Sequence, residues 1–352
     1  MEAYAEQDWP LVTRFLERWP DATVDCGAIP SLRYRTKLQF VLQLPKLFLF
    51  GFDVGIKALR ADEPPKAFVV HTDPEVIALA VVQLITRKRV PIILCGFIYT
   101  LRKSSLLTWL RRHYFRMVLA LTRGVICHST LETIRYRRIF VLESLRLAVV
   151  PFALNVEIPP TIKIHEGGYV LSAGRAERDY GLLSEAWSGL PLRLKIVCDT
   201  EAPLRSVKTS QNIELLRRCF GSDFQRQIAG ADFVVVPIKD RQLSAGQMVL
   251  LQAMALGKPV IITRTPTTEE YGEHLKTLYF VDHGSVESLR NAILTLANDP
   301  KLRATIGTAA RAHYERNHTV SAYANGVLSA VENLLSDEHT IDVCNRCGVQ
   351  AP

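Results

Sequence analysis

The hydrophobic residues of this chain follow two spacings that alternate along its length. Short runs rich in Val and Ile are separated by longer segments in which apolar residues recur every three or four positions. The first spacing predicts buried strands and the second predicts amphipathic helices, so we expect βαβ units on parallel sheets. The predicted strands are residues 67–71, 90–97, 124–128, 147–150, 169–173, 192–198, 233–238, 260–263 and 278–281.

Helix boundaries are marked most clearly near the end of the chain. Ser285 is expected to cap a helix that runs to Ala297, Asp299-Pro300 opens another helix, and residues 320–335 form the last one. The sequence signals for helices and strands are weaker before Lys66. There, residues 22–26 fit a strand, and a helix over 37–49 is expected to be interrupted at Pro45.

The length of the chain and the positions of its prolines predict two domains. With 352 residues and 48% hydrophobic content, the chain has enough apolar material for two cores. A strand-like run ends at Pro151, and Pro159-Pro160 cannot continue regular structure. We therefore place an N-terminal domain at residues 1–155, a second domain at residues 156–335 and a polar tail at residues 336–352.

A first group of candidate binding residues follows the predicted strand 169–173. This strand runs into Gly174 and Arg175, and a helix is expected to begin near Asp179. A strand, a tight glycine turn and a helix N-terminus favour an anion, because free N–H groups and the helix dipole face it. Arg175 and Arg178 would add charge-assisted contacts to a diphosphate. Alternatively, Gly174 only turns the chain and the arginines are solvated.

A second group follows the strand 233–238. The segment Ser244-Ala-Gly-Gln247 fits a capping box, and Gly246 would allow a ligand to approach the helix N-terminus closely. Gly257 would end that helix in a left-handed conformation. Gln252 lies on the same helix among apolar residues, where a buried amide needs polar partners such as a ribose. A well-capped helix without a ligand is the alternative interpretation.

Together these segments resemble the C-terminal donor domain of GT-B glycosyltransferases, particularly glycosyltransferase family 4. The similarity runs from about residue 168 to 335, and the N-terminal half matches more loosely at 68–80, 90–94, 124–136 and 149–157. It is carried by LSAGR at 171–175, ADFVVVPI at 231–238, LLQAMALGKPVI at 250–261 and a spaced pattern over 291–311. The resemblance implies two doubly wound Rossmann-like domains facing a cleft, with a nucleotide diphosphate sugar held mainly by the second domain.

The chain departs from this family at two acidic positions. The resemblance implies a glutamate pair that contacts the sugar and the ribose, but Ser244 and Gln252 occupy those positions. Gln252 can still hydrogen-bond a diol, whereas Ser244 lacks a carboxylate. The predicted donor-binding residues are Gly174, Arg175, Arg178, Ser244, Gly246, Gln247 and Gln252. Retention and inversion of the anomeric configuration both remain open.

Candidate catalytic residues follow the predicted strand 67–71. In a GT-B enzyme, the groups acting on the acceptor stand at the carboxyl ends of the N-terminal sheet. His71 and Asp73 occupy such a position, and either could deprotonate an acceptor hydroxyl in an inverting mechanism. In a retaining mechanism, His71 would orient the sugar, while arginines and a helix N-terminus stabilise the leaving group. Alternatively, Asp73 only caps the helix that begins at Pro74.

The positive charge is concentrated in the first half. Residues 1–155 contain 22 Lys and Arg against 13 Asp and Glu. In the helix 101–123, an apolar face is expected to pack on the sheet, opposite Arg112, Arg116 and Arg123, although a packed helix without a partner would also expose arginines. The apolar face comprises Leu107, Leu110, Tyr114, Met117, Val118 and Leu121. We expect these arginines to meet an anionic membrane surface.

The absence of targeting, metal-binding and nucleic-acid-binding motifs in the sequence restricts the classes of function that we expect. The acidic N-terminus lacks the pattern of a secretory signal, and no apolar stretch suits a membrane span, so we expect a cytoplasmic, peripherally bound protein. No Asp-x-Asp cluster holds a metal, Cys344 and Cys347 lack further ligands, and no nucleic-acid motif is present. We therefore expect a metal-independent glycosyltransferase without a cofactor, acting on a glycan or lipid-linked acceptor in polysaccharide or glycoconjugate biosynthesis. A non-catalytic sugar-nucleotide-binding subunit and a nucleotide-sugar epimerase are the alternatives.

Overall fold

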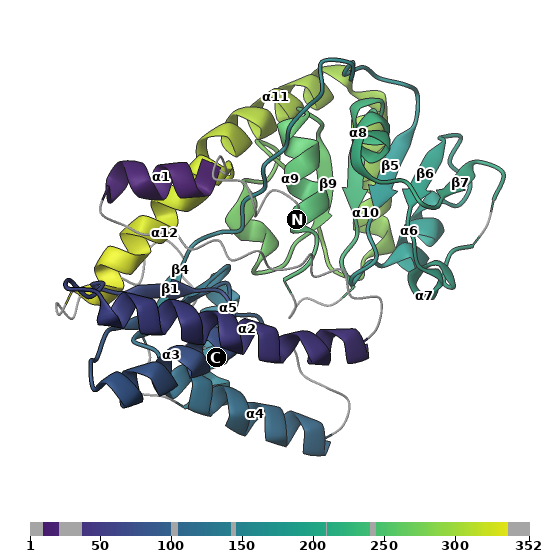
Figure 1. The fold of residues 1–352 in the computed structure, drawn as a ribbon. Coiled ribbons are helices and arrows are strands. Elements are labelled where there is room, and N and C mark those ends of the chain that lie inside the picture. Colours follow the sequence, from purple (N-terminus) through teal and green to yellow (C-terminus); the bar gives the residue numbers. More distant parts are fainter. Residues whose placement is uncertain are drawn as a thin grey trace. The chain divides into compact units, whose positions relative to one another are not determined.

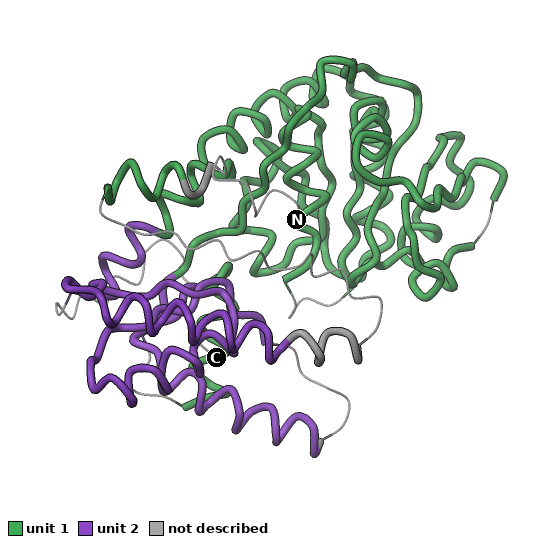
Figure 2. Tube along the Cα trace, in the orientation of Figure 1, with its two compact units in different colours: residues 1–33, 127–141, 149–327 green, residues 34–126, 142–148, 328–352 purple. Residues whose placement is uncertain are grey.

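The computed structural model describes residues 10–20, 37–99, 105–141, 146–208, 210–239 and 244–336. Two compact units divide the chain, and both are discontinuous in sequence (Figure 2). Unit 1 comprises Met1–Arg33, Cys127–Val141 and Val149–Val327, and unit 2 comprises Tyr34–Ile126, Leu142–Ala148 and Leu328–Pro352. The continuous domains with a boundary near residue 155 stay a prediction.

The first sheet has the strand order β1-β2-β3-β4. The pairs β1–β2 and β2–β3 are parallel, as the alternating pattern predicted. The strands are β1 (Phe68–Val70), β2 (Ile92–Cys95), β3 (Gly124–Cys127) and β4 (Arg146–Val149). The helices of this half of the sequence are α1 (Pro10–Arg18), α2 (Lys37–Arg60), α3 (Asp73–Thr86), α4 (Ser105–Ala120) and α5 (Thr130–Phe140).

Helix α2 corrects the prediction of an interruption at Pro45, because it continues through that residue to Arg60. It packs along α3, and two glycines four positions apart make the close approach possible. A Cβ added to Gly51 would lie 3.1 Å from the Glu75 Cα, and one added to Gly55 would lie 2.9 Å from the Leu79 Cδ2. Packing between the helices thus outweighs the local cost of the proline.

The second sheet lies in unit 1 and has the order β10-β9-β8-β5-β6-β7, with every neighbouring pair parallel (Figure 1). The strands are β5 (Val170–Ala173), β6 (Leu194–Val197), β7 (Ile213–Leu216), β8 (Val234–Val236), β9 (Val260–Thr263) and β10 (Tyr279–Val281). Strand β7 was not predicted from the sequence. It is an edge strand with an exposed Glu214 and no fully buried residue, so it lacks a strong apolar pattern.

Helices cover both faces of this sheet. Residues of β5, β8 and β9 alternate between two hydrophobic cores, one shared with α8, α9 and α11 and the other with α6 and α10. The helices are α6 (Tyr180–Trp187), α7 (Glu201–Leu204), α8 (Gly221–Ala229), α9 (Gln247–Ala255), the 3₁₀ turn η2 (Thr268–Tyr271), α10 (Val286–Asn298), α11 (Pro300–Asn317) and α12 (Val320–Leu335). The doubly wound α/β architecture predicted for this half is confirmed.

The strand order reverses between β5 and β8. From β5 the chain moves outward to β6 and β7, and then it returns to pair β8 with the other side of β5. Open parallel sheets bind ligands at the carboxyl ends of the strands beside such a reversal. The fold therefore points to the segments after Ala173 and after Val236.

Local signals at the predicted helix ends are confirmed. The Ser285 hydroxyl accepts from the Ser288 N–H at 3.1 Å, and Gly257 follows α9 with φ of +64°. Gly257 also fixes the distance between α9 and α11. A Cβ added to Gly307 of α11 would collide with the Gly257 carbonyl oxygen.

We predict that Gly307→Ala lowers the free energy of unfolding by about 2–3 kcal/mol, since overpacking forces backbone shifts. Chemical denaturation of the whole chain measures the change. Thr308→Ala is the matched control, because Thr308 lies exposed on the same helix and should change stability by less than about 0.5 kcal/mol. Equal stability of the two variants would contradict the packing described for α9 and α11.

Candidate functional site

The loop after β5 begins with a glycine in a left-handed conformation. Gly174 has φ of +107°, and its N–H donates to the Val197 carbonyl at 3.0 Å. The Arg175 side chain extends into solvent and lies 3.4 Å from the Asp199 carboxylate. Of the two arginines predicted here, Arg175 is therefore the one whose side chain a ligand can reach.

Arg178 instead supports the loop from inside. Only 7% of the residue is exposed, and its guanidinium donates to the Ala173 and Ala176 carbonyls, each at 2.8 Å. Burial lowers the pKa of this guanidinium. A Cβ on Gly174 would collide with it, which explains why glycine is needed at that position. The geometry gives Arg178 a role in shaping the loop.

The N-terminus of α6 is capped by a carboxylate of the protein itself. The Asp179 carboxylate accepts from the Leu182 N–H at 3.0 Å and caps the helix that was expected to begin there. A second negative charge at this end would be repelled by the carboxylate. The α6 N-terminus is therefore less suited to a further anion than a helix end without a carboxylate cap.

The loop after β5 is joined directly to the segment after β8. Arg178 and Ile238 form an antiparallel bridge, the Asp179 N–H donates to the Pro237 carbonyl at 3.1 Å, and the Lys239 N–H donates to the Glu177 carbonyl at 2.9 Å. The structure thus brings the two groups of predicted binding residues to one edge of the sheet.

The capping box predicted at Ser244-Ala-Gly-Gln247 is wrong. Helix α9 begins at Gln247, and its N-cap is Gly246 with φ of +99° and no side-chain cap. The Ser244 hydroxyl lies 3.3 Å from the Ser129 hydroxyl and 3.4 Å from the Thr267 hydroxyl. Without a side chain at its cap, the N-terminus of α9 is better suited to a diphosphate than that of α6.

Glu270 is a residue near Ser244 that the sequence analysis missed. Its Oε1 accepts from the Thr130 N–H at 2.8 Å, and its buried Oε2 has no hydrogen-bond partner among the described residues. Burial raises the pKa of this carboxyl, and hydrogen bonding from Thr130 opposes the increase only in part. The sequence offers only a weak signal, an acidic pair at 269–270 after a strand.

Gln252 lies in the second turn of α9, as expected, but it is not a buried amide. The side chain is partly exposed, and its Nε2 donates to the Met248 carbonyl of the same helix at 3.1 Å. It therefore needs no ligand to satisfy it. Its place on α9 still leaves it available to a ligand at that helix.

The candidate catalytic residues lie in unit 2, at the carboxyl end of β1. The N-cap of α3 is Thr72, which corrects the alternative that placed Asp73 at the cap. The Glu75 carboxylate accepts from the Thr72 N–H at 2.9 Å and closes this turn. The Asp73 carboxylate accepts from the Tyr114 hydroxyl of α4, and burial raises the pKa of Tyr114. His71 is exposed beside them.

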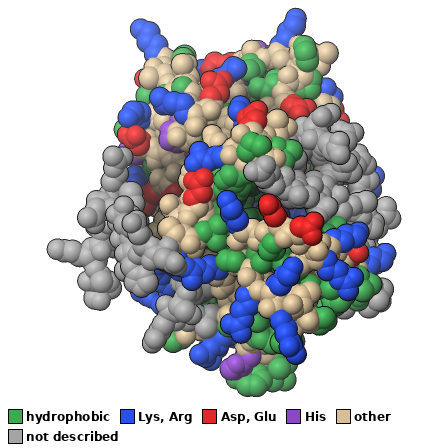
Figure 3. Space-filling model, turned by 60° about the vertical axis from the view of Figure 1, so that its left-hand side comes forward, with side chains coloured by type: hydrophobic (Ala, Val, Ile, Leu, Met, Phe, Trp, Pro, Cys, Tyr) green, Lys and Arg blue, Asp and Glu red, His purple; other side chains and the backbone are tan. Residues whose placement is uncertain are grey.

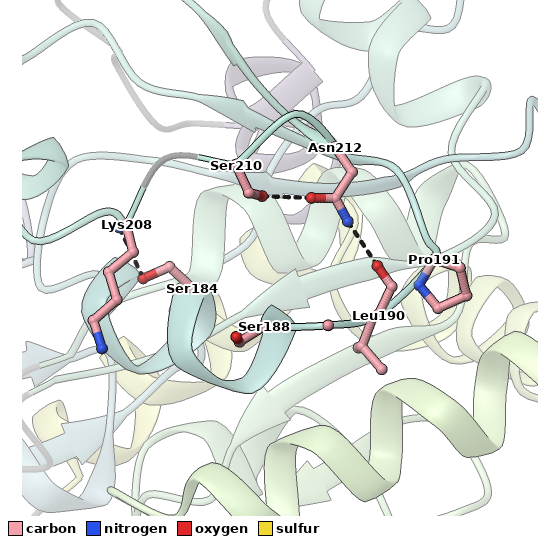
Figure 4. Close-up of a pocket in the computed structure, with 8 residues that line it drawn as sticks. Ser184, Ser188, Leu190, Pro191, Lys208, Ser210 and Asn212 are labelled. Atoms are coloured by element: carbon pink, nitrogen blue, oxygen red, sulfur yellow. Dashed lines mark hydrogen bonds between the residues drawn. The ribbon is translucent and has the colours of Figure 1, made fainter.

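One pocket lies away from all of these residues. It is lined by the end of α6 and by residues that precede β6 and β7, among them Leu190, Lys208 and Asn212 (Figure 4). Asn212 donates to the Leu190 carbonyl at 2.7 Å, and the Lys208 N–H donates to the Ser184 hydroxyl at 3.2 Å. The pocket is at the amino ends of the strands, whereas the predicted donor residues are at the carboxyl ends.

The described residues contain no group of three or more His, Cys, Asp or Glu side chains that could hold a metal ion. Cys344 and Cys347, which have the spacing of metal ligands, lie outside the described part of the chain.

Comparison with known families identifies the segment that carries this site. Residues 167–299 match the family of glycosyl transferases group 1. The matched segment includes both loops beside the strand reversal. The chain is also 32% identical over 121 residues to a GDP-mannose-dependent monoacylated alpha-(1-6)-phosphatidylinositol monomannoside mannosyltransferase of Corynebacterium glutamicum. That match spans 33% of this chain and about a third (32%) of the relative.

Solved structures confirm the GT-B fold. Sucrose-phosphate synthase from Thermosynechococcus elongatus has a TM-score of 0.62 at 16% identity, over 87% of this chain and 82% of that protein. A glycosyltransferase from Rickettsia africae has a TM-score of 0.61 at 14% identity, over 93% and 88%. HepE from Anabaena, solved with UDP and glucose, has a TM-score of 0.58 at 16% identity, over 84% and 83%.

The two arginines of the first loop should behave differently when replaced. Arg178→Met keeps most of the side-chain volume but removes the donor of the buried Ala173 carbonyl and of the partly buried Ala176 carbonyl, and we predict a loss of about 2–4 kcal/mol in the free energy of unfolding. Arg175→Ala removes an exposed ion pair and should cost at most about 1 kcal/mol. Urea unfolding of both variants measures the difference. Equal losses would contradict the assignment of Arg178 as the internal support.

Proposed function

We propose that this protein transfers a sugar from a nucleotide diphosphate sugar, bound at the carboxyl edge of the second sheet. The observation that carries the proposal is the meeting of the loops after β5 and β8 at the strand reversal, inside the segment that matches group 1 glycosyl transferases. Open α/β sheets place their ligands at this position. The whole protein's activity is part of the proposal, because the family match covers residues 167–299 only.

In this proposal the N-terminus of α9 holds the diphosphate. Gly246 leaves its first turn without a side-chain cap, and Gln247 begins the helix. Arg175 supplies a positive charge from the neighbouring loop, after exchanging the Asp199 carboxylate for phosphate oxygens. Gln252 would bind the ribose hydroxyls, and Ser244 would offer a hydroxyl to the sugar. We propose that no metal is required, because the helix dipole and Arg175 oppose the diphosphate charge.

The acceptor would meet unit 2 at His71 and Asp73. Asp73 already accepts a hydrogen bond from Tyr114, which positions the carboxylate. As a general base it would act on an acceptor hydroxyl held in place by His71. In a retaining mechanism, both residues orient the acceptor, and the N-terminus of α9 stabilises the leaving diphosphate.

We further propose a glycan or lipid-linked acceptor at the cytoplasmic face of a membrane, within polysaccharide or glycoconjugate biosynthesis. The name of the Corynebacterium relative describes a phosphatidylinositol mannoside acceptor, which supports a lipid-linked class. Arg112 and Arg116 are exposed on α4 and would meet anionic lipid. Arg123 is also exposed, although its Nε lies 3.4 Å from the Leu334 carbonyl.

A non-catalytic nucleotide-sugar-binding subunit is the second candidate. The observation that favours it is the Ser244 hydroxyl, which already contacts Ser129 and Thr267 and brings no charge to a sugar. Only the transferase would convert the bound donor to free nucleotide. Release of free nucleotide from the bound donor, with or without acceptor, supports the transferase and excludes the silent subunit.

Calorimetric titration with UDP, GDP, ADP and their common sugar conjugates tests the donor site. We predict that one nucleotide binds and that Arg175→Ala weakens its binding at least tenfold, because a charge-assisted hydrogen bond contributes about 1.5–3 kcal/mol. Arg193→Ala is the matched control, since Arg193 precedes β6 at the opposite edge of the sheet. Absence of binding by every nucleotide in the folded wild type would contradict the donor site.

A further inference from the structure

Helix α4 presents its apolar side outward. Of the six residues expected to pack on the sheet, only Val118 is buried, which corrects the predicted orientation of the helix. The inward side is instead formed by Phe115, Val118 and Leu119, with the Phe115 ring 5.2 Å from that of Phe97. The outward apolar side, called here the α4 surface, comprises Leu106, Leu107, Trp109, Leu110, Met117 and Leu121, each 41–64% exposed.

The α4 surface is continuous because of its spacing. Leu106, Leu110 and Met117 follow at intervals of four and seven residues, so they share one side of α4, and Leu121 comes directly after the helix, four positions beyond Met117. Scattered apolar residues are normal on a protein, but a contiguous group of this kind marks a site that is covered in use. We therefore expect an apolar partner to cover the α4 surface.

Charge around the α4 surface identifies the occupant. Arg112 and Arg116 are exposed on the same helix, and the helix itself, residues 105–120, contains three Arg and no Asp or Glu. Figure 3 shows Lys and Arg side chains mixed with hydrophobic ones over the lower part of the face in view. A second copy would set this acid-poor surface against its own arginines. An anionic lipid surface offers both apolar chains and opposite charge.

The helix is too short to span the hydrocarbon core of a bilayer. It has 16 residues, which at 1.5 Å per residue is about 24 Å and shorter than the ~30 Å hydrocarbon core. Within the described residues, no helix has the length and hydropathy needed to cross a membrane. Trp109 is of the residue type that favours the boundary between lipid headgroups and acyl chains.

We propose that α4 lies in the plane of an anionic bilayer and inserts the α4 surface among the acyl chains, while Arg112 and Arg116 bind the headgroups. This inference rests on the proposed peripheral location and specifies how the membrane is held. Arginines alone would give binding that salt abolishes. Insertion adds a component that salt does not remove, since burial of apolar surface does not depend on screening.

Flotation with two kinds of vesicle tests the proposal, using phosphatidylcholine alone or with phosphatidylglycerol. The wild-type chain should bind the anionic vesicles at 0.15 M NaCl and keep a fraction of that binding at 1 M NaCl. The variant Leu106→Gln/Leu110→Gln/Met117→Gln should bind at least tenfold more weakly and lose the salt-resistant fraction. Arg112→Gln/Arg116→Gln should lose the preference for phosphatidylglycerol and keep the salt-resistant fraction.

The matched control is Ile134→Gln/Ile164→Gln/Phe220→Gln, which replaces three exposed apolar residues of unit 1 and should bind as the wild type does. Brominated lipid should quench tryptophan fluorescence, and Trp109→Phe should remove most of that quenching. Circular dichroism confirms that each variant is folded. Nucleotide is omitted throughout, so a failure here leaves the donor-site proposal standing.

Three results would overturn the inference. The wild type could fail to bind either vesicle, or the triple α4 variant could bind as the wild type does. The wild type could also be a dimer in solution that the triple α4 variant makes monomeric, which would assign the surface to a second copy of the chain.

Discussion

The parallel pairing of β5 with β8 is the constraint on which the candidate site depends. These strands are neighbours in the sheet although about sixty residues separate them in sequence, and the register sets Leu171 beside Val234. Because both strands run the same way, the loops that follow them leave the same edge. The bridge from Arg178 to Ile238 then fixes the two loops to each other. Without this pairing, Gly174, Arg175 and the N-terminus of α9 would share no surface.

The structure separates two roles that the sequence had combined. Arg175 and Arg178 are three positions apart, and both suit a diphosphate by charge alone. Arg178 is buried and donates to the Ala173 and Ala176 carbonyls, while Arg175 reaches solvent. The same separation holds for helix N-termini, since Asp179 caps α6 and Gly246 leaves α9 uncapped. The shape of the loop and the binding of a ligand are thus assigned to different residues of one turn.

Features that are set by neighbouring residues could be predicted from the sequence, whereas features that depend on distant contacts could not. The strands around Ala173 and Val236, the Ser285 cap and the end of α9 at Gly257 are set by neighbouring residues, and each was found where it was predicted. The cap at Ser244 was wrong because its hydroxyl contacts Ser129, which is 115 positions away. The exposed side of α4 was also wrong, because periodicity shows that a helix has an apolar side but not which side the core covers. Glu270 had only a weak signal in the sequence, because its hydrogen bond from Thr130 joins segments 140 positions apart.

A segment that matches group 1 glycosyl transferases, a candidate site at the strand reversal and a helix that presents apolar residues outward occur in one chain. The central claim is that a nucleotide sugar binds at the carboxyl edge of the second sheet. Hydrogen exchange of the whole chain, measured with and without the nucleotide sugar that it binds most tightly, tests this claim directly. The account predicts slower exchange at residues 174–180 and 244–252. Slower exchange at residues 188–191 and 208–212 instead, at the opposite edge, would contradict it.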